Sequence, residues 1–388
     1  MLTPRSSWET QSEPFAKSAS PPKFMIKISR LFGYSYFLVC ALATSVSIVA
    51  SESVVDIGDR RELFVDETLV EGLSGKASLC LHHPVPQEVV MVHDEPWEGA
   101  GSSYHSIFKD GDVYRMYYKS WHIKPRHKGD PVNPHCCAYA ESDDGIHWRK
   151  PDLGLHAFNG STENNIVMPS GPRDGFVMNA AHPAVFKDSN PDAAPEARYK
   201  ALFRSDDPKG LMAYQSPDGI HWELLTDQLI LTDGAFDSVN LAFWDEVNQE
   251  YRAYWRYFAD GNLEDLHRGA RSIRTATSKD FIHWGNQANL EYVDSPEEQL
   301  YTNAIKPYFR APHILMGFPM RYIERGNQPS SAPGYEALSH AEKTGYWSAS
   351  LLALPDVEHR KMRGSFHERF GSAISEGLFM ASRDGVKF

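Results

Sequence analysis

The feature that most constrains the fold of this chain is a short polar phrase that closes on an aromatic residue and occurs four times. The copies are SDDGIHW at 142–148, SPDGIHW at 216–222, SKDFIHW at 278–284 and SRDGVKF at 382–388. Alternating, aromatic-rich segments typical of β-strands precede the copies. A strand-rich unit that repeats at intervals above about 40 residues predicts the blades of a β-propeller rather than a helical solenoid.

The first complete unit contains the strands that a propeller blade requires. The expected strands are 102–109, 113–121, 136–142 and a short strand that carries Trp148. A tight-turn signal, KDGD at 109–112, joins the first two. Because three later units repeat this order, we predict an all-β protein made of antiparallel four-stranded sheets.

The repeated phrase has a mechanical interpretation as a turn. Gly145, Gly219 and Gly385 can adopt the positive φ that a tight hairpin often demands. The aspartate accepts hydrogen bonds from turn amides, and the closing aromatic ring stabilises the fold by roughly 2–3 kcal/mol when it is buried between blades. The third copy has Phe281 in place of glycine, so its turn is expected to differ. We interpret the phrase as structural rather than catalytic.

The number of units predicts an incomplete ring. The last copy ends at Phe388, inside its fourth strand, and four units are visible. An open blade edge exposes unpaired amides, so we predict a five-bladed β-propeller that is truncated in its fourth or fifth blade. Residues 61–70 are a candidate clasp strand for the final blade. The insert at 322–376 carries a predicted helix around 357–370.

The N-terminal region predicts export. Residues 1–24 are polar and rich in Ser and Pro, which indicates a disordered segment or a misassigned start before Met25. Residues 25–51 combine basic residues, an apolar run and a small-residue cleavage site, which predicts a signal peptide ahead of a propeller domain at 58–388. The protein is therefore expected to be secreted or periplasmic. The alternative is an N-terminal membrane anchor, because the apolar run approaches spanning length.

Charge and cysteine content exclude some classes of function. The net charge of −12, with no long basic run, argues against nucleic-acid binding. No motif requires a cofactor, no metal-ligand spacing occurs, and no stable membrane partner is expected beyond the signal segment. Cys80, Cys136 and Cys137 lie outside that segment, and adjacent cysteines seldom bond to each other. Free buried thiols are the preferred interpretation; a bond from Cys80 to either neighbour is the alternative.

The long polar loops are predicted to share one face of the propeller. They are 122–135, 205–210, 259–270 and 322–376. Function usually sits on loops held by a rigid scaffold, so inner-strand residues near this face are candidates for a site. These candidates are Glu98, Tyr104, His105, Asn179, His182, Asp237, Asn240, Tyr301, Asn303 and Lys306.

Carboxylates that face a central funnel suit glycoside hydrolysis, in which one acid protonates the leaving oxygen and another activates water or attacks the sugar. Asp237 and Glu98 are the candidates for these roles, and His182 would assist them. His105, Asn240 and Asn303 are assigned to substrate binding. For each acid the alternative is a capped turn or a salt bridge. The separation of the carboxyl groups is not readable from sequence, so retaining and inverting mechanisms both stay open.

Cations recur at one position of the predicted second strands. Lys119, Arg204 and Arg256 each follow a tyrosine by five positions, and Arg321 closes the corresponding strand of the fourth unit. A ring of cations near the binding face would bind carboxylate, sulfate or sugar hydroxyls. We therefore assign Arg256 and Arg321 to substrate binding. The alternative is that these cations pair with acids on neighbouring loops.

These motifs resemble those of a known group of enzymes. The repeated phrase, with AHP at 181–183 and FKD at 186–188, resembles the five-bladed propeller glycosidases of glycoside hydrolase families 32 and 43. Most of the chain is similar to secreted "glycosyl hydrolase family 32 N-terminal-like" proteins of planctomycete-type bacteria. The segments that carry this likeness are LHHPVPQEVV at 81–90, AFDSVNLAFWDE at 235–246 and RTATSKDFIHW at 274–284.

The resemblance implies a secreted glycoside hydrolase-like protein that cleaves glycosidic bonds of a polysaccharide or oligosaccharide by carboxylate acid/base catalysis. Some motifs depart from the families. Family 43 enzymes place Asp before the proline where this chain has His182, and the Asn-Asp-Pro and Arg-Asp-Pro motifs of family 32 are not found. The alternatives are a non-catalytic carbohydrate-binding propeller and an inactive truncated fragment of such an enzyme.

Overall fold

The computed structural model describes residues 55–99, 101–121, 135–261, 269–293, 295–296, 298–323 and 374–388. In these ranges the regular structure is β-strand, apart from one short 3-10 helix at Pro195–Ala197. The predicted disordered and signal segments and the predicted helix at 357–370 lie outside the described residues. The prediction of an all-β fold is confirmed for the part of the chain that is described.

The first sheet is an antiparallel meander in the order β1-β2-β3-β4, with β5 paired to β3. Its strands are β1 (Ser103–Asp110), β2 (Val113–Ser120), β3 (Cys136–Ser142), β4 (Trp148–Arg149) and β5 (Ile166–Pro169). The second half of β2 and nearly all of β3 are buried on both faces, which explains why aromatic and small apolar residues dominate their sequences.

The second sheet follows the same plan in the order β10-β9-β8-β7-β6. Its strands are β6 (Gly171–Arg173), β7 (Phe176–Lys187), β8 (Tyr199–Asp206), β9 (Lys209–Ser216) and β10 (Glu223–Leu224). The long strand β7 changes register between Asn179 and Ala184. This irregularity lets one end pair with β6 while the other end stays in the meander.

The third and fourth sheets have the orders β11-β12-β13-β14 and β15-β16-β19. The strands of the third are β11 (Leu241–Asp245), β12 (Glu250–Phe258), β13 (Arg271–Ser278) and β14 (Trp284–Asn289). Those of the fourth are β15 (Ile305–Tyr308), β16 (Ala311–Gly317) and β19 (Met380–Ser382). Two further strands, β17 (Met320–Ile323) and β18 (Ile374–Gly377), pair with each other.

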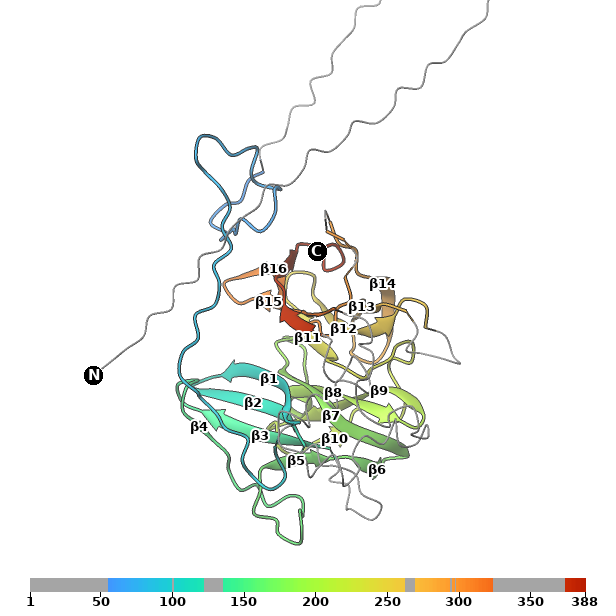
Figure 1. Cartoon of the computed structure of the whole chain (residues 1–388). Coiled ribbons are helices and arrows are strands. Elements are labelled where there is room, and N and C mark those ends of the chain that lie inside the picture. Colours follow the sequence, from blue (N-terminus) through green and yellow to red (C-terminus); the bar gives the residue numbers. More distant parts are fainter. Residues whose placement is uncertain are drawn as a thin grey trace, which may run out of the picture. The chain divides into compact units, whose positions relative to one another are not determined.

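The four sheets are arranged as the blades of a propeller (Figure 1). Contacts join β1 to β7, β7 to β11 and β11 to β15, so the first long strands of successive sheets lie next to one another. Lys306 Nζ of β15 donates to the Ile107 carbonyl of β1 over 3.4 Å, which brings the fourth sheet back to the first. The described residues thus form four blades around a common centre, and a fifth blade stays a prediction.

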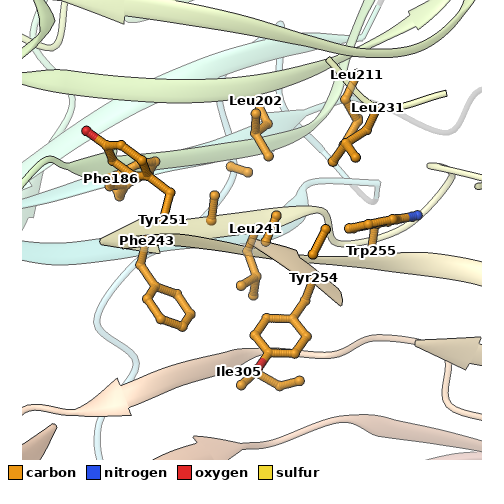
Figure 2. Close-up of a cluster of buried hydrophobic side chains, with 14 of the residues drawn as sticks. Phe186, Leu202, Leu211, Leu231, Leu241, Phe243, Tyr251, Tyr254, Trp255 and Ile305 are labelled. Carbon is orange, nitrogen blue, oxygen red and sulfur yellow. The ribbon is translucent and has the colours of Figure 1, made fainter. Parts of the chain in front are cut away.

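The core consists of side chains that fill the spaces between sheets (Figure 2). Leu241, Phe243 and Tyr254 of the third sheet point toward Ile305 of the fourth. The opposite face of the third sheet packs on the second sheet. Because both faces of this sheet are covered, β11 has the apolar run LAFW rather than a strict polar alternation.

The four repeated turns share one hydrogen-bond pattern. In the first, Gly145 N donates to Ser142 Oγ over 2.9 Å, and Ile146 N and His147 N both donate to Asp144 Oδ1 over 2.8 Å. Trp148 Nε1 closes the turn on the Gly145 carbonyl. The serine and aspartate bonds recur in the other three copies. The interpretation of the phrase as a structural turn is confirmed.

The prediction that the third turn must differ is wrong. Phe281 has a φ of 67°, close to the 79–80° of Gly145, Gly219 and Gly385, and its turn keeps the same bonds. A left-handed conformation costs a non-glycine residue about 1–2 kcal/mol. The Phe281 ring is fully buried in the core, and the burial of a ring of this size outweighs that cost.

Three of these turns dock on the second long strand of the preceding sheet. Tyr117 of β2 donates to the Gly219 carbonyl over 2.9 Å, and Tyr254 of β12 donates to the Gly385 carbonyl over 2.8 Å. A Cβ at Gly219 would lie 2.5 Å from the Tyr117 hydroxyl. The strand that faces the third turn has Leu202 in place of the tyrosine, and Leu202 shares the core cluster of Phe281. At this interface the aromatic ring is that of Phe281 in the turn, whereas at the other two it is that of a tyrosine on the strand.

The segment before the first sheet contacts the last one. Arg383, in the fourth repeated turn, forms ion pairs with Glu62 (2.9 Å) and Asp66 (2.7 Å). His313 Nε2 lies 3.0 Å from Glu62 Oε1. Residues 61–70 form no strand, so the prediction of a clasp strand is wrong in form. Ion pairs, rather than a backbone ladder, join this segment to the last described one.

Two further findings concern the predictions on cysteines and membranes. Cys80, Cys136 and Cys137 form no disulfide bond with one another; Cys80 is exposed, whereas Cys136 and Cys137 are buried in β3. Within the described residues, no helix combines the length and the apolar character needed to cross a membrane. The predicted anchor or signal segment lies outside these residues.

Candidate functional site

The inner strands of the sheets are irregular where they begin, next to the centre. Tyr104, Phe236 and Ala304 adopt φ values of 56°, 57° and 46°, although none is glycine. In the second sheet the corresponding distortion is the register change between Asn179 and Ala184. Strained backbone and bulges concentrate at functional sites. These four strand starts are therefore the first place to look for a site.

The strand starts surround a cavity of about 570 Å³. All four sheets contribute to its wall, with His105 from β1, Pro183 from β7, Leu241 from β11 and Lys306 from β15. The sequence placed these inner strands around a funnel, and this cavity is where they meet.

A polar group of side chains adjoins this cavity through Tyr104 and Tyr301, which line its wall, and we call it the central cluster. Its members are Tyr104, His182, Asp237, Arg256 and Tyr301. The Tyr104 and His182 rings are 4.7 Å apart in an edge-on contact. Arg256 Nη1 lies 3.2 Å from Asp237 Oδ1, and its guanidinium lies over the Tyr301 ring at 4.3 Å. Three predicted site residues, Asp237, His182 and Arg256, thus belong to one cluster.

Asp237 is partly accessible in this cluster. Its side chain is 24% exposed, whereas that of Arg256 is 4% exposed. Phe236, directly before it, is fully buried in its left-handed conformation. The buried phenylalanine anchors the backbone, and the positive φ turns the next side chain toward Arg256. Local strain here serves to aim a carboxylate.

His182 is held as a neutral imidazole. The side chain is buried, and Nδ1 has no hydrogen-bond partner among the described residues. Burial, together with the charges of Lys119, Arg204 and Arg256, holds the pKa of His182 well below its ordinary value, and only Asp237 opposes the shift. At neutral pH the ring can both donate and accept one hydrogen bond.

Asn240 and Asn303 hold the loop that carries Asp237. Asn240 Nδ2 donates to the Phe236 carbonyl over 3.1 Å, and Asn303 Nδ2 donates to the Val239 carbonyl over 2.8 Å. Both side chains are buried, and the structure shows no partner for either Oδ1 atom in its described residues. These two predicted binding residues position the backbone and still offer one acceptor each.

Glu98 belongs to a different set of contacts. It is 2% exposed, and its carboxylate accepts hydrogen bonds from Lys150 Nζ (2.6 Å), the Tyr118 hydroxyl and Glu95 N (3.2 Å). Burial alone would raise its pKa, but these bonds and His93 lower the pKa to about 2. Glu98, the predicted catalytic partner of Asp237, is thus a carboxylate whose oxygens already accept hydrogen bonds from the protein.

A chain of imidazoles links Glu98 to the cavity. His93 Nδ1 lies 3.5 Å from Glu98 Oε1, and His93 Nε2 lies 3.1 Å from His105 Nε2. The His93 and His105 rings stack at 5.3 Å. If Glu98 accepts the Nδ1 proton of His93, then His93 Nε2 accepts from His105, which leaves His105 Nδ1 as an acceptor at the cavity wall. The contact with His93 thereby orients the His105 ring.

Arg321 pairs with acids outside the central cluster. Its guanidinium pairs with Glu298 (2.8 Å) and with Glu376. This is the alternative that the sequence left open, in which strand-end cations pair with neighbouring acids. Arg204 likewise lies 2.7 Å from Asp206 Oδ1. Among the strand-end cations, Lys119 behaves differently, because it contacts aromatic rings rather than an acid.

The sequence missed several members of these networks. His93, Tyr118 and Lys150 surround Glu98 but lie on three separate elements, and no spacing in the sequence links them. Lys150 carried one weak signal, since it follows the repeated turn at the point where the chain leaves β4. In the described residues, no group of three or more His, Cys, Asp or Glu is arranged to hold a metal ion.

Comparison at the sequence level gives a short match. No family model matches the chain. Two uncharacterised proteins of Mycobacterium tuberculosis are 36% identical to it over 78 residues, which is 19% of this chain and 24% of each relative. The match thus spans about a quarter of the length of these relatives and assigns no family.

Comparison of structures gives longer but weak similarities. A structure of the GH130 family of mannoside phosphorylases, which contains hydrolases that target β-1,2-mannosidic linkages in Candida mannan, has a TM-score of 0.36 at 15% identity, over 57% of this chain and 63% of that one. A GH93 α-L-arabinofuranosidase of Fusarium graminearum has a TM-score of 0.37 at 12% identity, over 63% of both chains. A fructofuranosidase of Schwanniomyces occidentalis has 0.38 at 14% identity, over 60% and 42%.

The printed names of these three structures are those of glycoside hydrolases or of a family that contains them. Their TM-scores lie below 0.5 and their identities below 25%, a level that assigns neither activity nor substrate. The chain has distant structural similarity to propeller glycoside hydrolases.

Proposed function

We propose that this protein hydrolyses glycosidic bonds at the central cluster, with Asp237 as the reacting carboxylate. The observation that carries the proposal is the convergence of Tyr104, His182, Asp237 and Arg256 at distorted strand starts beside the central cavity. Glycoside hydrolysis needs a carboxylate that can attack the sugar or activate water. Arg256 stabilises the negative charge of Asp237, which suits the role of nucleophile or general base rather than that of proton donor.

The neighbouring residues fit the remaining tasks. The neutral His182 ring can hydrogen-bond a sugar hydroxyl or the leaving oxygen. Tyr104 and Tyr301 offer aromatic surfaces against which the apolar face of a sugar can pack. Asn240 and Asn303 fix the Asp237 loop through backbone carbonyls. Held geometry of this kind is what lets a carboxylate react with an oriented substrate.

The direct test replaces Asp237 with asparagine, which keeps the shape and removes the charge. On a panel of polysaccharides and oligosaccharides, wild-type protein should release reducing ends, and D237N should lose at least about 10³-fold in rate. Thermal unfolding should show that the variant is folded.

The matched control is Asp233→Asn. Asp233 lies on the same loop but pairs with Arg274 at the surface and is 68% exposed, so D233N should keep wild-type activity. Full activity in D237N would remove Asp237 from the mechanism.

A second candidate function is carbohydrate binding without catalysis. The engagement of Glu98 favours it, because Lys150, Tyr118 and Glu95 already occupy that carboxylate. In this case wild-type protein would bind a glycan without releasing reducing ends, and D237N would bind it about as well. Retained binding with abolished turnover in D237N supports the hydrolase instead.

A further inference from the structure

Lys119 stands out among the cations near the central cluster. It lies at the end of β2 and is 9% exposed. Its amino group lies 5.6 Å from the centre of the Tyr104 ring and 4.4 Å from that of Trp121. Within the described ranges, no carboxylate pairs with it. A buried ammonium group without a counterion is costly, so the site gains stability from any anion that reaches it.

His182 lies beside the same tyrosine. The His182 ring is 4.7 Å from the Tyr104 ring, and its buried Nδ1 is the atom without a partner noted above. Lys119 also acts on the charge state of His182. Two polar groups that are each more than nine-tenths buried therefore flank one tyrosine ring, and both lack a ligand from the described protein.

The surrounding charge is positive. Arg204, Lys209 and Arg256 lie in the same neighbourhood, together with the carboxylates of Asp206 and Asp237. With Lys119 included, four cations face two carboxylates in the described part of this region. The whole chain has the opposite balance, with a net charge of −12. The local charge balance is thus opposite in sign to that of the whole chain.

We propose that Lys119 and His182, with the rings of Tyr104 and Trp121, form a subsite for a sugar that carries a carboxylate or a sulfate group. The proposal rests on the proposed function, since it names the class of glycan that the central cluster takes. Lys119 supplies the charge, the neutral imidazole supplies one N–H donor, and the aromatic rings pack against the sugar. A uronic acid and a sulfated sugar share this chemistry.

The subsite should titrate in an unusual range. Burial lowers the pKa of Lys119 to about 8, so its charge is present at pH 7 and lost as the pH rises through 8. Burial also lowers the pKa of Lys209 in this neighbourhood, so the pH dependence is assigned to Lys119 only if the Lys119 variants lose it. His182 is already neutral, and burial raises the pKa of both Tyr104 and Cys137, which lies opposite Lys119 on β3. Arg204, Arg256 and Asp237 also face this region, and the indole of Trp121 carries no titratable group.

The experiment measures binding by calorimetry for three oligosaccharides of matched length, which are neutral, uronic and sulfated. Wild-type protein should bind at least one charged ligand at least about 10-fold more tightly than the neutral one. Lys119→Met should remove this preference while changing the affinity for the neutral ligand less than about twofold, and Lys119→Arg should retain it. For wild type the preference should decline between pH 7 and pH 9.

The control is Lys109→Met, because Lys109 lies on the neighbouring strand β1, is exposed and contacts Tyr114 at the opposite strand end. This variant should keep the preference, which shows that the loss of any one cation is not sufficient. If K119M does not fold, Lys119→Gln replaces it. Equal affinity for neutral and charged ligands in wild type, or an unchanged preference in the folded Lys119 variant, would overturn the proposal. Comparison of the affinities for the uronic and the sulfated ligand shows whether the subsite prefers a carboxylate or a sulfate group.

The outcomes also separate this proposal from the proposed function. Hydrolysis of neutral glycans, with no preference for charged ones, would contradict the proposed subsite and support the proposed hydrolase activity. If wild-type protein binds a charged glycan through Lys119 but never cleaves it, the proposed subsite is supported and the proposed hydrolase activity is contradicted.

Discussion

The four sheets of this protein are alike at their repeated turns and different at their inner strand starts. At the turns, one serine and one aspartate satisfy the same amides in every copy. At the strand starts, three sheets have a non-glycine residue at positive φ and the second has a register change, and buried polar atoms of His182, Asn240 and Asn303 have no partner in the described structure. The turns therefore belong to the scaffold, and the strand starts belong to the candidate site.

The comparison has a physical basis. A repeated turn is selected for stability, so every donor and acceptor finds a partner and the sequence converges on one solution. A binding site must keep groups free for a ligand and accept strained backbone, which costs stability. Repetition in the sequence therefore marks the scaffold, and the loss of repetition on the same strands marks the place where chemistry can occur.

The largest expected effect breaks the scaffold side of the comparison. Phe281→Gly restores the residue of the other turns but removes a fully buried ring. Loss of a buried phenylalanine costs about 3–5 kcal/mol, and relief of the positive φ returns only about 1 kcal/mol of this. We expect a net loss of about 3 kcal/mol in the free energy of unfolding, measured by urea denaturation.

A second substitution sharpens the same test. Leu202→Tyr introduces, on the facing strand, the ring that Tyr117 and Tyr254 supply to the other turns. It should be destabilising in the wild-type background, where Phe281 fills the space, and should recover much of the loss in the F281G background. Additive effects of the two changes would show that the turn and the strand are not coupled.

The next effect concerns Glu98, a carboxylate near the site whose hydrogen bonds are satisfied. Its pKa is lowered from 4.5 to about 2, so its ionised form stabilises the fold by about 2–3 kcal/mol above pH 4.5. That stability is lost as the pH falls toward 2. Glu98→Gln should be less stable than wild type by this amount at pH 7, and the gap should narrow below pH 4.5. A gap that is constant from pH 7 to pH 3 would contradict this role.

The smallest expected effect lies in the central cluster and has the opposite sign. His182→Met removes a buried nitrogen that has no partner among the described residues, so stability should stay equal or rise by up to about 1 kcal/mol. Under the proposed function, glycan turnover or binding should fall in the same variant. A large loss of stability would show that His182 is part of the scaffold.

The sequence predicted the sheets well because their signals are local. The strands Val113–Ser120 and Cys136–Ser142 lie where the pattern placed them, since aromatic residues and turn signals mark both strands. The phrase at 278–284 misled only at Phe281, where a contact with a strand far away in the chain decides the conformation. No local pattern carries that information.

The site was predictable as a region but not as a network. The strand starts were identified, and Asp237, His182 and Arg256 do lie together. The engagement of Glu98 depends on His93, Tyr118 and Lys150, which come from separate elements. The pairing of Arg321 with Glu298 and Glu376 depends equally on tertiary structure. Sequence gives the residue types near a centre, and only the packed chain decides which of them are occupied.

The docking of each turn on the sheet before it gives the molecule a direction. Tyr117 donates to the carbonyl of Gly219, and Tyr254 donates to that of Gly385. In both cases the acceptor lies later in the chain, so each of these interfaces forms only after the later residues have been synthesised. A growing chain can thus seal one interface at a time, from its N-terminal sheet onward. Removing the last sheet would uncover one face of the third sheet and release the contacts of Ile107, Glu62 and Asp66, but it would leave the earlier joints intact.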